Sequence, residues 1–424
     1  MAKSLPEWES LRDHASAIKR HTLTHLADYL EQFSSQLESR GVIVHWAKDA
    51  NELNEMVYGI LESHKVTKMV KSKSMLTEEC GLNAYLEQRG IDVVETDLGE
   101  RILQLMHRAP AHIVVPAMHI TKEEVAETFE AKGISADKGN TDPTYLTYCA
   151  RKSLRHEFME AGAGLTGCNF GVAKTGDIVV CTNEGNADMT TSMPKLHIVT
   201  MGIEKLVPDY ESLAVFQRLL CRSATGQPTT GFTSHFRQAR PGAEMHVVLL
   251  DNWRSDALAN PEHWETLKCI RCGACMNTCP VYRRSTGASY TYFIPGPIGV
   301  DLGMLANARR YSDNVSACSL CLSCDNVCPA EVKPGSQIYL WRQSLDGIGK
   351  ADHLKKFMSE GMELLFDHPT LYTDALKLSP LANFVPEMLT HYSHLNPWGL
   401  GHAKPKFASQ SFHGWWKEQQ NKKK

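Results

Sequence analysis

The sequence predicts an α/β domain with a largely parallel sheet, then a smaller cysteine-rich helical domain and a mostly helical or irregular C-terminal tail. Two observations favour this order. Short β-branched segments alternate with helix-like segments from about residue 42 to 251, and eight of the 13 cysteines follow, between Cys269 and Cys328. We expect an N-terminal helical segment over 1–60 that leads into the α/β domain, the α/β domain over 61–252, the cysteine-rich domain over 260–345 and the tail over 346–424.

The first 40 residues have the spacing of an amphipathic helix. Leu26, Leu30, Phe33 and Leu37 follow one another at intervals of four, three and four residues, which places them on one helical face. We expect this helix to end at Gly41.

Seven β-branched segments predict strands: VIVHWA, KVTKMVK, IDVVET, HIVVPA, DIVVCT, LHIVTM and MHVVLL. Helix-like segments such as NELNEMVYGILES and LTEECGLNAYLEQR separate them. This alternation is typical of a parallel sheet. Polar residues 252–262 then precede the rise in cysteine density, so we expect the domain boundary there.

Composition excludes several classes of protein. A formal net charge of −3 gives no general attraction to phosphate backbones, so nucleic acid is not expected as a partner. The N-terminal segment MAKSLPEWESLRDHAS lacks the apolar region of a signal peptide. The chain also lacks the roughly 18 consecutive apolar residues of a membrane span. We therefore expect a cytoplasmic protein without a transmembrane segment, peripheral to a membrane only through partners.

The cysteine region contains two copies of the motif CxxCxxCxxxCP. In a chain without an export signal, clustered cysteines indicate metal binding rather than a disulfide framework. The spacing is that of two-cluster ferredoxins and predicts two [4Fe-4S] clusters. The copies are CIRCGACMNTCP, with Cys269, Cys272, Cys275 and Cys279, and CSLCLSCDNVCP, with Cys318, Cys321, Cys324 and Cys328.

In this motif the fourth cysteine ligates the other cluster. The exchange joins the two halves of the domain and keeps the clusters close enough for electron transfer. Pro280 and Pro329 turn the chain away after each fourth cysteine. We predict cluster 1 on Cys269, Cys272, Cys275 and Cys328, and cluster 2 on Cys318, Cys321, Cys324 and Cys279.

Zinc is the alternative metal, since it also takes four cysteines. Zinc sites, however, usually pair CxxC units at a distance and need no third cysteine three residues on. The segment between the two motifs is helix-compatible, above all in GVDLGMLANARRYSDN. The region therefore resembles the α-helical ferredoxin modules in electron-transfer subunits of the succinate dehydrogenase type.

A nucleotide site of the Rossmann or P-loop type is not supported. The one GxGxxG, GAGLTG at 162–167, follows a helix-like segment instead of a strand, and GxxxxGK[ST] is absent. It belongs to the glycine-rich segment GAGLTGCNFGVAKTGD at 162–177. We expect this segment to be a tight connection into the strand DIVVCT, or alternatively a loop that cradles an anion.

Two polar segments after predicted strands are candidates for a ligand pocket, because α/β sheets bind ligands at the ends of their strands. The segment TNEGNAD follows DIVVCT, and Lys71 lies in KMVKSKSM after another strand. A turn and a solvated loop, respectively, are the alternatives. The candidate pocket residues are Lys73, Ser74, Asn183, Glu184, Gly185 and Asn186.

The other cysteines and several histidines show no ligand spacing. We expect the cysteines to be small core residues and assign no role to the histidines. The cysteines are Cys80, Cys149, Cys168, Cys181 and Cys221, and the histidines are His107, His112, His119, His235 and His246.

Three stretches together resemble the lactate utilization protein B family over nearly the whole chain. They are KSKSMLTEECGLNAYLEQRGIDVVETDLGE, TGDIVVCTNEGNADMTTSMPKLHIVTMGIEK and the double CxxCxxCxxxCP motif. The last 50 or so residues are least distinctive. All eight motif cysteines match the family's pattern.

The resemblance implies a LUD domain, related in fold to the NagB/RpiA/CoA-transferase group, followed by a dicluster ferredoxin domain. It also implies an iron–sulfur subunit, inactive alone, of a complex that oxidises L-lactate to pyruvate. The implied partners are a cysteine-rich iron–sulfur protein of the protein A type and a small LUD protein of the protein C type. The catalytic residues stay unknown, and we expect the lactate-oxidising group in a partner or at a subunit interface.

Two other functions stay open. The chain could be the iron–sulfur subunit of another 2-hydroxy-acid dehydrogenase, such as one for glycolate. It could also be a non-enzymatic protein that binds a ligand and senses redox state.

Overall fold

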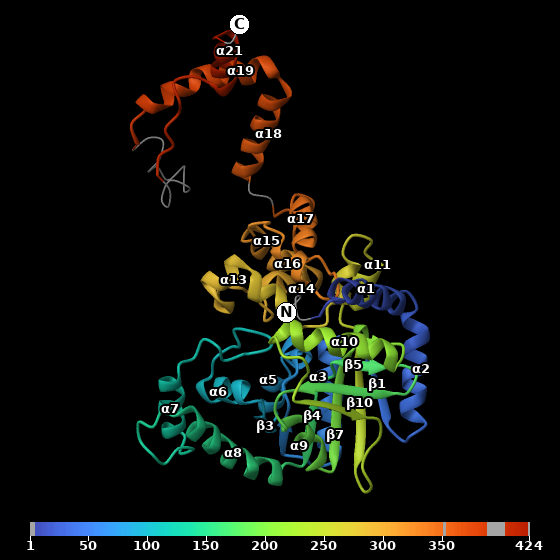
Figure 1. The fold of residues 1–424 in the computed structure, drawn as a ribbon. Coiled ribbons are helices and arrows are strands. Elements are labelled where there is room, and N and C mark those ends of the chain that lie inside the picture. The colour runs from blue at the N-terminus through green and yellow to red at the C-terminus, as the bar shows by residue number, and fades with distance from the viewer. Residues whose placement is uncertain (1–4, 351–352, 388–402, 423–424) are drawn as a thin grey trace. The chain divides into compact units, whose positions relative to one another are not determined.

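The computed structural model describes residues 5–350, 353–387 and 403–422, and the chain divides into two compact units. Unit 1 spans Met1–Ile348 and unit 2 spans Gly349–Lys424. Both the α/β part and the cysteine-rich part therefore belong to unit 1. The fold confirms the predicted order of an α/β domain, a cysteine-rich helical module and a helical tail (Figure 1).

A six-stranded, fully parallel sheet forms the centre of the α/β domain. Its inner strands are buried on both faces, because helices cover the two sides. Buried aliphatic side chains such as Met69, Leu165, Ile198 and Val248 therefore fill one core. In spatial order the strands are β1 (Ile43–Ala47), β10 (Glu244–Leu250), β7 (Leu196–Gly202), β4 (Ala163–Thr166), β2 (Lys68–Lys71) and β3 (Asp92–Glu95).

A second, four-stranded sheet contains β8 (Leu206–Val207), β5 (Phe170–Val172), β6 (Asp177–Thr182) and β9 (Phe232–Phe236). The segment DIVVCT is thus a strand, β6, but it pairs antiparallel with β5 and β9 outside the parallel sheet. The remaining helical elements of the α/β domain are α1 (Trp8–Thr24), α2 (Leu26–Glu38), α3 (Ala50–Ser63), α4 (Met75–Cys80), α5 (Leu82–Glu87), α6 (Leu98–Met106), α7 (Lys122–Ala131), α8 (Pro143–Glu160), α9 (Asn186–Ser192), η2 (Ile203–Lys205), α10 (Tyr210–Ala224) and α11 (Arg254–Ala259).

The glycine-rich segment 162–177 is not the simple connection or loop that we expected. It contains two strands, β4 and β5, and β4 lies between β2 and β7 in the parallel sheet. A Cβ on Gly164 would lie 1.8 Å from the carbonyl oxygen of Thr190, the helix α9 residue that packs on β4. Glycine is therefore required in this strand, because the helix approaches it closely. Since glycine is typical of loops, the composition of the segment did not indicate a strand.

The segment HIVVPA, predicted as a strand, is an irregular loop. Its Ile113 side chain is buried against the cysteine-rich module instead of in a sheet, in the same core cluster as Cys272 and Cys275, whereas Val115 is exposed. Pro116 also lacks the N–H that a central strand needs. Hydrogen bonds to the module fix the loop: the Tyr282 hydroxyl donates to the Ala111 carbonyl oxygen at 2.6 Å.

Two helix predictions were too simple. Residues 1–40 contain two helices, α1 and α2, separated at His25, and LTEECGLNAYLEQR contains α4 and α5, separated at Gly81 in the left-handed conformation. The apolar face of α2 is as predicted, with Phe33 and Leu37 fully buried.

The cysteine-rich module is helical and packs on one end of the α/β domain (Figure 1). Helix α1 braces it: Arg12 Nε donates to the Cys328 carbonyl oxygen at 2.9 Å, and Lys268 Nζ donates to Ser16 Oγ at 3.1 Å. The elements of the module are η3 (Trp264–Lys268), α12 (Ala274–Thr278), α13 (Pro280–Ser285), η4 (Gly287–Ser289), α14 (Gly296–Tyr311), α15 (Asp313–Ser316), α16 (Ser323–Val327) and α17 (Pro334–Ser344).

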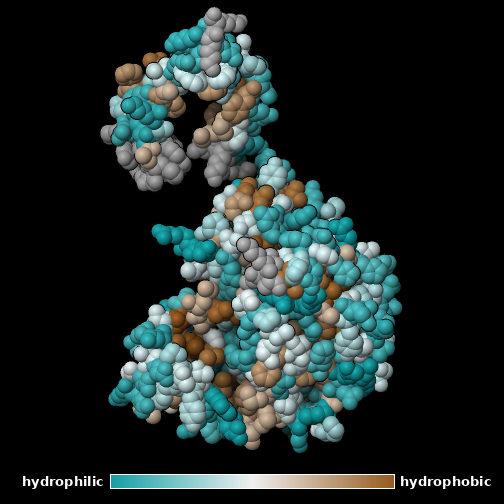
Figure 2. All heavy atoms as spheres, in the orientation of Figure 1, coloured by the Kyte–Doolittle hydropathy of each residue, from teal (hydrophilic) through white to brown (hydrophobic). Residues whose placement is uncertain are grey.

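Unit 2 is helical and has no core of its own among its described residues, none of which is buried. Figure 2 shows hydrophobic side chains open to view on its surface; Phe357, Phe384 and Phe412 are 74%, 85% and 69% exposed. Its elements are α18 (His353–Asp367), α19 (Pro369–Leu378), η5 (Ser379–Phe384) and α21 (Phe412–Lys422). Among the described residues, no helix is both long and apolar enough to cross a membrane.

Candidate functional site

The two cysteine motifs fold into matching loops. Arg271 and Leu320, each two residues after the first cysteine of its motif, both adopt the left-handed conformation, with φ of 60° and 52°. Gly273 and Leu322, two residues further on, do the same, with φ of 77° and 57°. Each loop then enters a five-residue helix, α12 or α16, and these two helices pack against each other. The sequence repeat is therefore a structural repeat.

Backbone N–H groups point at sulfur atoms in both loops. Arg271 N donates to Cys269 Sγ at 3.4 Å, and Leu320 N donates to Cys318 Sγ at 3.3 Å. The fourth cysteines also accept, Cys279 Sγ from Tyr282 N at 3.5 Å and Cys328 Sγ from Val332 N at 3.3 Å. Such bonds stabilise thiolates and tune the potential of an iron–sulfur cluster.

Cys328 lies with the first three cysteines of the other motif. A small cavity of about 20 Å³ is lined by Cys269, Cys272, Cys275 and Cys328 and by apolar side chains that include Ile113 and Ile298. No cysteine from the second motif besides Cys328 lines it. Four sulfur donors around an enclosed apolar space fit a [4Fe-4S] cluster.

The second set of cysteines is nearer to the surface. Burial raises the pKa of the Cys318 thiol, and the neighbouring Cys279 and Cys321 act in the same direction. Cys318 and Cys279 are partly exposed, and Cys321 is exposed. Cys324 is buried and interacts with Cys275 of the first set. The first set is thus the inner one and the second set the outer one.

A cavity of about 320 Å³ lies where the strands β2, β4 and β7 end, against the first cysteine loop. We call it the strand-end cavity. Its volume is in the range of small-molecule sites, and the carboxyl ends of parallel strands are where α/β sheets bind ligands. Ile113 and Cys272 line both this cavity and the small cavity between the inner cysteines. The two spaces therefore share a wall.

Five of the six candidate pocket residues line the strand-end cavity: Lys73, Ser74, Asn183, Glu184 and Asn186. Gly185 does not line it. Lys71, which we grouped with Lys73, lies within β2 and is buried, with Nζ 2.7 Å from Glu95 Oε1 and 3.2 Å from Glu78 Oε1. Lys71 therefore pairs with buried carboxylates in the interior and does not contribute its charge to the cavity.

Lys73 and Glu184 lie on the polar side of the cavity with Asp97. Lys73 Nζ donates to the Val114 carbonyl oxygen at 2.7 Å and lies 3.9 Å from Asp97 Oδ2. Glu184 is exposed to solvent, but partial desolvation at the cavity and the negative charge of Asp97 both act to raise the pKa of its carboxyl group.

A second group of cavity residues was not predicted from the sequence. Glu204, Lys205 and Arg271 line the cavity from η2 and from the first cysteine loop. The only signal available was that Arg271 lies between two cysteine ligands. Cys168, Cys181 and Cys221, which we expected to be core residues, also line the cavity.

A buried ion-pair network supports this wall. Arg254 makes a bidentate pair with Glu79, at 2.9 and 3.0 Å, and donates to Glu204 Oε2 at 2.6 Å. Burial by itself disfavours the ionised form of Glu204, but the neighbouring cations Arg254, Lys205 and Arg271 outweigh it and lower the pKa of Glu204 to about 2. Glu204 is therefore a fixed carboxylate.

The loop 111–120 closes the cavity toward the module. Val114 N and Val115 N donate to His112 Nδ1 at 3.0 and 3.1 Å, so Nδ1 is unprotonated and Nε2 donates to Asn277 Oδ1 at 3.2 Å. Burial lowers the pKa of His112, which keeps this neutral tautomer. His112 thus has a positioning role between the loop and α12.

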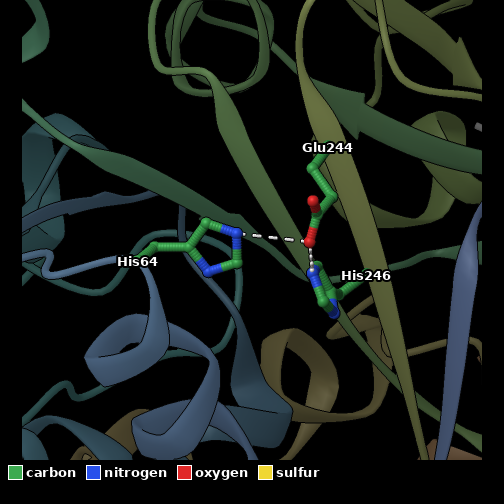
Figure 3. Close-up of side chains that lie close together, drawn as sticks. All are labelled: His64, Glu244 and His246. Carbon is green, nitrogen blue, oxygen red and sulfur yellow. Dashed lines mark hydrogen bonds and ion pairs between the residues drawn. The ribbon is translucent and has the colours of Figure 1, made fainter.

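At the opposite ends of the strands, His64, Glu244 and His246 form the one group among the described residues whose ligand atoms lie close enough together for a single metal ion, all within 4.8 Å of one another (Figure 3). Glu244 Oε1 lies 2.6 Å from His246 Nε2 and 3.3 Å from His64 Nε2. His45 Nε2 lies 2.9 Å from His246 Nδ1. These residues also satisfy one another as a hydrogen-bonded network without a metal.

Residues 30–250 match a family model described as LUD domain, and residues 265–332 match one described as 4Fe-4S dicluster domain. Lactate utilization protein B of Shouchella clausii is 40% identical over 393 residues, which cover 90% of this chain and 82% of the relative. The protein of the same name from Geobacillus thermodenitrificans is 39% identical, covering 99% of this chain and 90% of the relative. An "Uncharacterized electron transport protein YkgF" of Escherichia coli is 36% identical, with coverage of 100% and 91%.

Proposed function

Because this chain belongs to the lactate utilization protein B family, we propose that it is the iron–sulfur electron-transfer subunit of a complex that oxidises L-lactate to pyruvate. The observation that carries the proposal is the shared wall between the strand-end cavity and the inner cysteine set. A small molecule in this cavity would contact the side chain of a cluster ligand.

We assign one [4Fe-4S] cluster to the inner set, Cys269, Cys272, Cys275 and Cys328, and one to the outer set, Cys318, Cys321, Cys324 and Cys279. When bound, each cluster accepts one electron at a time. Oxidation of L-lactate to pyruvate releases two electrons and two protons, so two adjacent one-electron carriers match the stoichiometry.

The arrangement also gives the transfer a direction. The inner set borders the cavity, and the outer set includes the exposed Cys321. Electrons would enter beside the inner set and leave near Cys321 to a partner protein. The partners that fit this function are a cysteine-rich iron–sulfur protein and a small LUD protein, with the chain inactive alone.

The test is anaerobic reconstitution with about eight iron and eight sulfide per chain, followed by optical measurement of cluster reduction. We expect L-lactate to bleach the cluster absorbance only when both partner proteins are present. Bleaching by this chain alone, or none with all three proteins, would contradict the proposal. Glycolate and other 2-hydroxy acids are the matched substrates: faster bleaching by one of them would assign the chain to a different dehydrogenase.

A further inference from the structure

Among the described residues, three that line the strand-end cavity each have a buried polar atom without a hydrogen-bond partner. The atoms are Asn186 Oδ1, Glu204 Oε1 and Arg271 Nη1, from α9, η2 and the first cysteine loop. Buried polar atoms are nearly always satisfied in native proteins, so each unpaired atom requires an explanation. A bound molecule that carries hydrogen-bond donors and acceptors would pair such atoms.

Arg271 and Glu204 define the chemistry of that molecule. Arg271 Nη2 and Glu204 Oε1 lie 3.7 Å apart, which is too long for a hydrogen bond and leaves a donor and an anionic acceptor side by side. A 2-hydroxycarboxylate carries a carboxylate, which accepts hydrogen bonds, and a hydroxyl group, which donates one, on neighbouring carbons. Its two groups therefore complement Arg271 and Glu204 in a single orientation.

We propose that the strand-end cavity binds a 2-hydroxycarboxylate, with its carboxylate on Arg271 and its hydroxyl group on Glu204. The identification of this ligand as L-lactate rests on the proposed function. The binding site then lies in this chain and not in a partner. The cavity is larger than a three-carbon acid.

The repeat supplies the variant that tests the role of Arg271. Leu320 occupies the equivalent position in the second loop, with the same left-handed backbone and the same N–H to sulfur hydrogen bond. Arg271→Leu should therefore keep the loop and its cluster while it removes the guanidinium group. The reciprocal variant Leu320→Arg is the matched control, because it changes the same position in the loop that does not line the cavity.

A second variant leaves the cysteine loops unchanged. Ala224 lies at the end of α10 and lines the cavity from the α/β side. Ala224→Trp should fill the space that the ligand needs, so it tests the cavity even if Arg271→Leu loses iron. Iron and sulfide counts are measured for every variant.

Anaerobic titration calorimetry of the full, cluster-loaded chain with L-lactate and with propionate gives the readout. We expect one L-lactate per chain and binding of propionate at least about tenfold weaker, because propionate lacks the hydroxyl group that would donate to Glu204 Oε1. Arg271→Leu should weaken L-lactate binding by roughly 10- to 100-fold, Ala224→Trp should abolish it, and Leu320→Arg should leave it unchanged. Equal affinity for propionate, or undiminished binding by Arg271→Leu or Ala224→Trp, would overturn the proposal.

The two proposals fail in different ways. If the chain does not bind L-lactate but is still reduced by L-lactate with its partners, the cavity assignment is wrong and the electron-transfer function stands. If the chain binds L-lactate as described but is not reduced in the full mixture, the electron-transfer function is wrong and the site stands.

Discussion

At the scale of single residues, the conformations of Arg271, Gly273, Leu320 and Leu322 explain how eight cysteines form two sets. A left-handed residue after the first cysteine and another before the third wind each loop tightly, so that three sulfur atoms converge. Only one of these four residues is glycine, so three carry the strain of a positive φ. The fourth cysteine follows a short helix and is free to join the other set.

Serine variants test the prediction that the fourth cysteine of each motif ligates the cluster of the other motif. Cys328→Ser removes a predicted ligand of the inner cluster, and Cys279→Ser removes one of the outer cluster. We expect each to lower the iron content from about eight to about four per chain. The paramagnetic spectrum of the remaining reduced cluster identifies which one is lost.

The controls are variants within each loop. With exchanged ligands, Cys328→Ser should give the same spectrum as Cys272→Ser, and Cys279→Ser the same as Cys321→Ser. If instead Cys328→Ser gives the same spectrum as Cys321→Ser, and Cys279→Ser the same as Cys272→Ser, each motif holds its own cluster.

Glu100 is a buried carboxylic acid with an unpaired side-chain oxygen. It is 6% exposed, and its Oε1 atom has no hydrogen-bond partner. Burial, together with the negative charges of Glu95 and Glu78, raises the pKa of Glu100 to about 8. The folded state therefore binds this proton more tightly than the unfolded state does, and stability falls as the pH rises from about 4.5 through 8.

Glu100→Gln should remove this loss of folding stability at high pH, because glutamine does not ionise. We expect the variant to unfold at a higher temperature than the parent at pH 8.5, with a gain on the order of 2 kcal/mol, and to match it near pH 5. Thermal unfolding across this pH range checks the prediction. Glu127→Gln, on the exposed face of α7, is the control and should show no such pH dependence. A constant difference between Glu100→Gln and the parent at all pH values would argue against a raised pKa.

At the scale of elements, the contact between β4 and α9 determines where the polar residues of the cavity lie. Helix α9 approaches β4 so closely that only glycine fits at position 164, and the helix begins at Asn186, which lines the cavity. The close contact at Gly164 thus helps to position the cavity-lining side chain of Asn186, more than 20 residues further along the chain.

Gly164→Ala and Gly59→Ala form a matched pair for this contact. The new methyl group at position 164 would overlap the Thr190 carbonyl oxygen, so we expect a loss of about 2–3 kcal/mol in the free energy of unfolding. At Gly59, inside α3, a Cβ meets nothing within 4 Å, and alanine should add about 0.5–1 kcal/mol through its helix propensity. Chemical denaturation measures both, and a tolerated Gly164→Ala would show that α9 can move away from the sheet.

At the scale of the whole molecule, all eight cysteines of the two motifs and the strand-end cavity belong to unit 1. A chain that stops after Ile348 should therefore fold and keep about eight iron atoms, because no cluster ligand is removed. Iron analysis and the thermal midpoint of chromophore loss check this. A chain that stops after Lys333 is the control: it lacks α17, which packs on α14 and α16, and should lose iron. Loss of iron on truncation at Ile348 would mean that unit 2 stabilises the clusters.

Much of the fold could be read from local pattern. The segments that became β1, β2, β3, β7 and β10 alternate with helix-like segments, which is typical of a parallel sheet. The exceptions have physical causes. HIVVPA has the composition of a strand but forms a loop, because Ile113 is buried against the module. GAGLTG has the composition of a loop but contains a strand, because Gly164 leaves space for the close approach of α9.

The sequence by itself predicted the candidate cluster ligands, because their spacing of three, three and four residues is local and matches the ferredoxin motif. It also pointed to Lys73, Ser74, Asn183, Glu184 and Asn186, since strand ends converge at one edge of an α/β sheet. Only the tertiary structure decided that this edge faces the inner cysteine set. Packing of η2, α11 and the loop 111–120 against the module brings Glu204, Arg254 and Ile113 to Arg271, and no local pattern records contacts over such separations in sequence.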